Sequence, residues 1–209
     1  MTHPTKRVLI DTVISLLEVK GPDAIISDEV LHQSGVSRGS MYHHFEDFAD
    51  LLESAQVKRF SNYVDDSILL LARLAASANS REELRSGLKE ITKLTQSPDL
   101  APRRFERIMP LSAASKNERL RCKLNAEQER LTRALMELVS ECQARGFFSL
   151  DHTPRVIAVM IQAYTLGRIV DDVTNEKVDP AEWNAIVDSI LDKVFGLDGI
   201  SSNRNQPTE

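Results

Sequence analysis

The feature that most limits the fold of this chain is the spacing of its apolar residues, which is helical almost from end to end. Near the N-terminus they recur at intervals of three and four residues, at Val8, Leu9, Val13, Leu16 and Leu17. The same spacing returns over residues 47–78 and 116–145. No stretch alternates apolar and polar residues over a useful length, as a half-buried strand would. We therefore predict an all-α protein.

Glycines, prolines and capping residues divide this pattern into separate helices. Gly21-Pro22, Ser34-Gly35 and Ser97-Pro98 interrupt it, Pro110 is expected to end a short helix, and Gly146 follows a long one. Ser27 is expected to cap a helix. The remaining predicted helices span residues 27–34, 37–45, 81–95, 155–174 and 180–196. We expect an N-terminal domain over 1–50, a larger helical domain over 51–198, and a flexible tail over 199–209.

Charge and composition exclude several classes of protein. The 209 residues carry a net charge of −5, which argues against coating nucleic acid through bulk positive charge. The longest uninterrupted apolar run, Val156 to Ile161, is far shorter than the roughly 20 residues of a membrane span. No signal-peptide pattern is present, and Cys122 and Cys142 lack a metal or redox spacing. These features predict a cytoplasmic protein without a membrane partner.

The predicted helix over 155–174 is apolar on nearly all sides, so it needs cover on nearly all sides. Small residues on it permit close approach of another helix, and the predicted C-terminal helix is a suitable companion. Two such helices from each of two subunits would form a four-helix interface in a homodimer. A core within one chain is the alternative. The predicted interface residues are Val156, Met160, Ala163, Gly167, Trp183, Ile186, Val187 and Ile190.

Residues 27–45 carry the clearest functional pattern. A helix of eight residues is followed by a tight turn at Gly35 and a second helix that opens at Ser37. Apolar residues on both segments are spaced to pack the two helices together. The second helix then exposes side chains that form hydrogen bonds: Arg38, Ser40, Tyr42, His43 and His44. This is the layout of a helix-turn-helix, which places its second helix in the major groove of DNA.

The run Gly35-Val36-Ser37-Arg38-Gly39-Ser40-Met41-Tyr42-His43-His44-Phe45, with Leu51 six residues on, resembles the signature of the tetracycline-repressor (TetR) family. The resemblance covers about residues 7–55, and it implies that 1–50 form a DNA-binding domain and 51–198 a helical effector-binding and dimerisation domain. It implies a homodimeric transcriptional regulator, usually a repressor, that binds a palindromic double-stranded DNA operator and is released by a small-molecule effector. The DNA-binding residues that it implies are Ser27, Ser37, Arg38, Gly39, Ser40, Tyr42, His43 and His44.

Among these residues, the guanidinium of Arg38 matches guanine O6 and N7, so Arg38 is the best candidate to read a base. Ser27 and Tyr42 would bind phosphate, which positions the helix without specifying a sequence. Adjacent histidines on a helix point about 100° apart, so we expect no metal at His43 and His44.

The chain departs from the family pattern at two places. Phe48 and Ala49 stand where the family usually has Lys-Glu, and Leu31 stands where a small alanine is favoured. The lost lysine and the −3 charge of residues 1–60 predict weak nonspecific DNA binding with a shallow salt dependence.

The effector site is less clearly marked. Candidates are residues with adaptable or polar-tipped side chains near a loop or on the central helix, with ordinary core positions as the alternative: Phe105, Met109, Leu124, Met160 and Tyr164. Residues 81–133 carry a charge of +5. Within them, Arg103, Arg104 and Arg107 would attract an anionic effector or form a solvated helix face. Arg168 is expected to form an ion pair at the interface, with Asp171 and Asp172 beside it.

Enzyme motifs are missing from the sequence. It has no glycine-rich phosphate loop, no HExxH and no Ser/His/Asp constellation with supporting turns. We therefore expect neither catalysis nor a cofactor. The competing hypothesis is a helical dimer that binds a ligand or a protein but not DNA.

Overall fold

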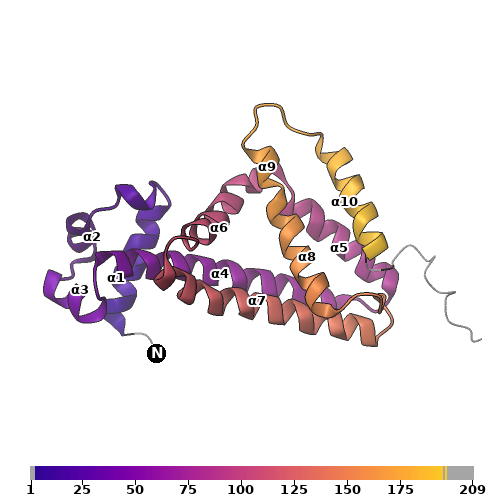
Figure 1. The fold of residues 1–209 in the computed structure, drawn as a ribbon, viewed down its shortest axis with the longest axis horizontal. Helices are drawn as coiled ribbons and strands as arrows, with labels where there is room; N and C mark the ends of the chain where they lie inside the picture. The colour runs from indigo at the N-terminus through magenta and orange to yellow at the C-terminus, as the bar shows by residue number, and fades with distance from the viewer. Residues whose placement is uncertain (1–2, 195, 197–209) are drawn as a thin grey trace, which may run out of the picture. The chain divides into compact units, whose positions relative to one another are not determined.

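The computed structural model describes residues 3–194 and residue 196, and within them every regular element is a helix (Figure 1). This confirms the all-α prediction, while the predicted tail over 199–209 lies outside the described residues. The α-helices are α1 (Pro4–Leu17), α2 (Ser27–Ser34), α3 (Arg38–His44), α4 (Phe48–Ser77), α5 (Arg81–Thr95), α6 (Ala101–Ala113), α7 (Glu118–Ala144), α8 (Pro154–Gly167), α9 (Ile169–Asp172) and α10 (Pro180–Val194). Short 3-10 turns, η1 (Pro22–Ala24) and η2 (Pro98–Leu100), precede α2 and α6.

The chain forms two compact units that share their longest helices. The first unit, here called the head, comprises the residues up to Val64 together with Pro110–Glu127. The second unit, here called the body, comprises Asp65–Met109 and the residues from Gln128 onward. Both α4 and α7 therefore contribute one part to the head and another to the body.

The head has its own apolar core, because α1 packs against α2 and α3 and the first turns of α4 close the cluster. The apolar stripe seen in the sequence faces inward: Leu9, Val13, Leu16, Ile25, Val30, Met41, Phe45, Leu51 and Ala55 are buried. Gly35 follows α2 with φ of 66°, a left-handed conformation that side chains with a Cβ rarely adopt. This glycine permits the tight turn that brings α3 back onto α1.

The body is built around a second core in which α5 packs against α10. Its buried residues come from α5, α7, α8 and α10, from the residue after α4 and from the turn after α7, namely Ala78, Leu84, Val139, Cys142, Phe148, Ile157, Val187 and Leu191. Gly146 has φ of 72° after α7, as its predicted role at the helix end requires. Among the described residues, no helix is long and apolar enough to cross a membrane.

Three predicted boundaries are wrong. Pro110 lies inside α6, which continues to Ala113, and the Pro110 carbonyl still accepts a hydrogen bond from Ala114 N at 3.0 Å. The helix predicted over 155–174 ends at Gly167, and the short α9 follows. Ser27 is the first residue of α2 rather than its cap, because the carbonyl of Ile26 accepts the first helical hydrogen bond, from Val30 N.

Candidate nucleic-acid interface

The head presents α3 as a short helix with one buried face and one exposed face. Met41 is fully buried in the head core, and Phe45, the residue after the helix, is 2% exposed. Ser37 caps the helix, since its Oγ accepts a hydrogen bond from Ser40 N at 3.2 Å and donates one to Ser40 Oγ at 2.9 Å. Because Met41 and Phe45 anchor one side, the opposite side is left to solvent.

The residues predicted to bind DNA lie on that exposed side, with two exceptions. Ser37, Arg38, Gly39, Ser40, Tyr42 and His43 are exposed. Tyr42 is half exposed, which is unusual for a large aromatic residue and leaves its hydroxyl free of the core. The exceptions are Ser27, at the start of α2, and His44, at the end of α3, which are half-buried rather than exposed. The structure thus gathers the α3 residues on one surface.

Gly39 leaves open space on this surface. A Cβ built on it would meet nothing within 4 Å, and its φ is not in the left-handed region. The backbone of α3 is therefore bare at this position, as a close approach to another backbone requires.

Histidines gather where α1 begins and α3 ends. The ring of His44 lies 4.6 Å from that of His3 and 5.1 Å from that of His43, centroid to centroid. Loss of hydration, followed by the charges of His3, His43 and Lys6, lowers the pKa of His44 below its ordinary value. His44 is consequently neutral at pH 7. In the described chain, no group of His, Cys, Asp or Glu is arranged to hold a metal ion.

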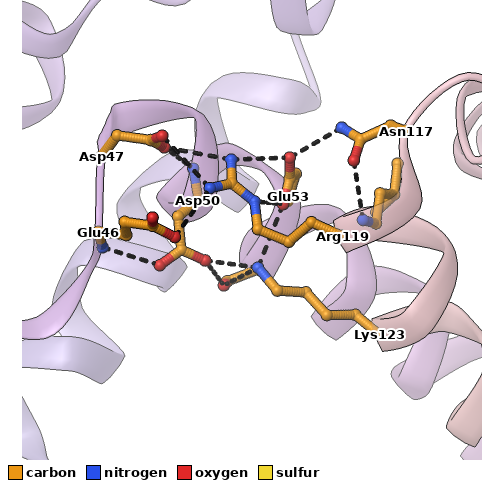
Figure 2. Close-up of polar contacts among 9 residues, drawn as sticks. Glu46, Asp47, Asp50, Glu53, Asn117, Arg119 and Lys123 are labelled. Carbon is orange, nitrogen blue, oxygen red and sulfur yellow. Dashed lines mark hydrogen bonds and ion pairs between the residues drawn. The ribbon is translucent and has the colours of Figure 1, made fainter.

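A cluster of acids and bases holds the corner between α3 and α4 (Figure 2). Asp47 Oδ1 accepts a hydrogen bond from Asp50 N at 2.6 Å, and Asp50 Oδ2 accepts one from Glu46 N at 3.0 Å. These two carboxylates cap the start of α4 reciprocally. Arg119 of α7 binds the same corner, with its Nη atoms 3.2 Å from Glu46 and from Asp47.

Glu53 is the buried centre of this cluster, with a side chain that is 6% exposed. It accepts hydrogen bonds from Arg119 Nε at 2.7 Å, Asn117 Nδ2 at 2.8 Å and Lys123 Nζ at 3.2 Å. Lys123 also binds Asp50. Every polar group at this corner therefore has a partner, as buried polar groups require.

Two opposing effects set the pKa values of these acids. Burial raises the pKa of Glu53 and of Asp50, but hydrogen bonds from Arg119 to Glu53 and from Lys123 to Asp50 outweigh it and hold both pKa values below their ordinary range. The backbone N–H of Asp50, and then Arg119, lower the pKa of Asp47. All three are ionised at neutral pH. Sequence reasoning missed Arg119 and Lys123, and the positive charge of residues 81–133 was the only signal of them.

The two departures from the family pattern have a packing explanation. Phe48 and Leu31 are half-buried and contact the head core. Phe48 therefore fills space against the core at a position where a lysine would have pointed a charge outward.

The residues predicted to lie in the dimer interface differ in how far they are exposed on the body. Val156 and Ile186 are about 60% exposed, and Ala163, Gly167 and Ile190 are exposed as well. Met160 and Trp183 are half-buried. Val187 is a correction: it is only 6% exposed, because its side chain faces the core of its own chain. Two residues that were not predicted, Val159 and Val170, extend the exposed apolar stripe.

The predicted effector residues do not form one group. Leu124 is buried in the head, whereas Met160 and Tyr164 pack against the body core and Met109 is half exposed. Phe105 is half-buried. None of the five lines the hollow of about 330 Å³ between α4 and α7 in the body, whose walls include Leu71, Ala75 and Leu138.

The basic residues of α6 are not a solvated face. Arg104 and Arg107 are about 5% exposed, and only Arg103 is open to solvent. Arg104 donates two hydrogen bonds to Asp172, at 2.6 and 2.8 Å, and two to backbone carbonyls. Arg168 pairs with Asp171 at 3.0 Å, as predicted, but the pair lies inside the chain, where the Arg168 guanidinium also covers the ring of Trp183.

No protein-family model and no curated protein matches the chain. Many solved structures do. One described as a TetR-family transcriptional regulator from Mesorhizobium loti is 15% identical, covers 92% of this chain and 96% of its own, and has a TM-score of 0.66. The chain has the TetR-family fold.

Two further structures of similar fold come from other bacteria. The fatty acid degradation regulator FadR from Bacillus halodurans is 20% identical, with 96% of this chain and 98% of its own covered and a TM-score of 0.62. A transcriptional regulator from Saccharomonospora viridis in complex with choline is 16% identical, with 90% and 95% covered and a TM-score of 0.63. The TetR-like arrangement thus extends far beyond the helix-turn-helix from which the sequence resemblance came.

Proposed function

We propose that this protein is a DNA-binding transcriptional regulator, and that it acts as a ligand-released repressor. The observation that carries the proposal is α3: a short helix, anchored by Met41 and Phe45, that exposes a row of hydrogen-bonding side chains on a TetR-like head. A helix of this kind enters the major groove. Catalysis has no part in the proposal, and the solved structures of similar fold are described as regulators.

Each residue predicted to bind DNA has a role in this proposal. Arg38 reads guanine through O6 and N7, while the Tyr42 hydroxyl and Ser27 bind phosphate. Ser37, Ser40, His43 and His44 contact backbone and base edges. Gly39 lets the helix backbone approach DNA closely.

The regulator would act as a homodimer. The exposed apolar stripe of α8 (Val156, Val159, Ala163 and Gly167) and the exposed Ile186 and Ile190 of α10 support this part of the proposal. Contiguous apolar surface of this kind marks a protein interface. A two-fold dimer matches a palindromic operator.

A small molecule that binds the body would release the operator. The choline complex of a protein with similar fold supports a small-molecule effector in general, and nothing in the present chain specifies choline. Met160 and Tyr164 remain the best candidates to contact it. An effector acts only through different affinities for the bound and released states of the protein. A regulator of this type works in the cytoplasm, where the DNA is.

Selection from a randomised pool of DNA duplexes tests this function. The 209-residue protein should enrich a two-fold symmetric sequence after several rounds. The rival hypothesis, a helical dimer that binds only a ligand or a protein, expects no enrichment. A pool that stays random at low and moderate salt would therefore overturn the proposed function.

A further inference from the structure

Arg38 is not free in the structure, because a second residue of the head holds it. Its Nη2 donates a hydrogen bond to Asp28 Oδ1, across ten residues of chain. Among the described residues, Asp28 is the partner that the structure gives to Arg38. The two side chains are 58% and 74% exposed, so the pair lies on the surface that α3 offers to DNA.

Helix electrostatics explain why these two residues meet. Arg38 is the first residue of α3, and a cation at a helix N-terminus is unfavourable. The first turn of α3 contains no acid that would offset this. Asp28 lies in the first turn of α2, where an anion is favoured, and its carboxylate supplies the missing negative charge from the neighbouring helix.

The bond to Asp28 leaves most of the guanidinium available. Arginine has five N–H donors in a fixed fork, and guanine O6 and N7 use only two of them. A guanine can therefore be read while Asp28 still holds the other side of the group. The ion pair also limits the rotamers of Arg38 before DNA arrives, which reduces the entropy lost on binding.

We propose that Asp28 is a specificity-determining residue that favours operator over arbitrary DNA. This proposal rests on the proposed function, in which Asp28 would have two effects. On arbitrary DNA, the carboxylate partly neutralises the charge that Arg38 offers to a phosphate, and the phosphate backbone repels the carboxylate itself. On the operator, the bidentate contact with guanine forms from an already oriented side chain. Specificity thus rests on a repulsive element as well as an attractive one.

The test removes the charge of Asp28 and keeps its size. Asp28→Asn should strengthen binding to a scrambled duplex by about fivefold, the upper range for an exposed ion pair, and should steepen the salt dependence by about one phosphate contact. Binding to the duplex that the wild-type protein selects should change less. The ratio of the two affinities therefore falls.

A matched control separates this effect from net charge. Asp23 is exposed on the 3-10 turn of the same head, and Asp23→Asn changes the charge equally without touching Arg38. The affinity ratio of Asp23→Asn should stay close to that of the wild type. In an Arg38→Ala background, Asp28→Asn should have no further effect on the ratio.

Equal ratios for Asp28→Asn and Asp23→Asn would overturn the inference while the proposed function stands. So would an effect of Asp28→Asn that persists without Arg38. If the wild-type protein selects no duplex at all, the proposed function fails, and the inference fails with it.

Discussion

At the scale of single residues, the proposed DNA interface depends on a few side chains that project from a helix anchored on one side. The buried side of α3 is fixed by Met41 and Phe45, so substitutions on its exposed side should alter binding without unfolding the head. Two residues on this surface give sharp expectations, Arg38 because of its geometry and His44 because of its pKa.

Replacing Arg38 by alanine should relax the choice of base. The loss of a bidentate contact with guanine costs about 1–3 kcal/mol of discrimination at that position. Measured by fluorescence anisotropy, binding to the selected duplex should weaken, and the preference for guanine at one symmetric position should vanish. An unchanged sequence preference, with the protein still folded and dimeric, would remove Arg38 from this role.

DNA binding should strengthen as the pH falls from 7.5 to about 5.5. Because the pKa of His44 is lowered in the free protein, the ring is neutral at pH 7 and gains its proton more readily beside phosphates. One added charge at the surface corresponds to an affinity gain of about fivefold. His44→Gln should flatten the pH profile, as titration by anisotropy would show. A wild-type profile that is flat or inverted contradicts this assignment.

At the scale of helices, the helices and turns could be predicted from the sequence, whereas ion pairs between residues far apart in the chain could not. The turn at Gly35 and the exposed face of α3 follow from residues within a few positions of one another. Arg119 and Glu53 are 66 residues apart, so no spacing rule brings them together. Arg104 is a similar case. A charged side chain is usually exposed to solvent, but Asp172, 68 residues along the chain, pairs with Arg104 and permits its burial.

The ionic cluster at the corner of α3 and α4 should stabilise the head. Replacing Arg119 by methionine leaves Glu53 buried with fewer partners, so the free energy of unfolding should fall by about 1–3 kcal/mol. The matched control is Arg121→Met, on the same helix, whose pair with Glu118 is largely exposed and should change the free energy of unfolding much less. Urea denaturation at constant protein concentration measures both variants.

The same cluster sets the direction in which the stability of the head changes with pH. Asp47, Asp50 and Glu53 have lowered pKa values in the folded protein, so their stabilisation is present at neutral pH and is lost as the pH falls below about 4. The stability difference between the wild type and Arg119→Met should therefore shrink in acid. A difference that stays constant from pH 7 to pH 3 would show that the contribution of Arg119 is not electrostatic.

At the scale of the whole molecule, the uneven charge of the sequence is partly balanced by ion pairs within each unit. Three of the positive residues of 81–133 pair with acids elsewhere within the same unit: Arg85 with Asp192, Arg104 with Asp172 and Arg119 with Glu53. These three arginines therefore add little to any surface that would bind DNA without regard to sequence. Because the chain is acidic, we expect its affinity for an operator to come from two heads that bind together.

The dimer should therefore be essential for operator binding. The wild-type protein should have twice the 23.5 kDa mass of one chain by light scattering. Ile186→Glu places a charge on the exposed apolar face of α10, which should shift the protein toward monomer and weaken operator binding. Leu69→Glu is the control, since Leu69 is equally exposed on α4, away from the predicted interface. Equal masses for the two variants would place the interface elsewhere.

The most direct test of the central claim is a competition titration of the wild-type dimer with its selected duplex. Labelled duplex is titrated in the presence of a large excess of scrambled competitor, and anisotropy reports the bound fraction. We expect one dimer bound per two-fold site, with a complex that the competitor does not remove from the wild type but does remove from Arg38→Ala. Complete displacement by the competitor at every salt concentration would contradict the account.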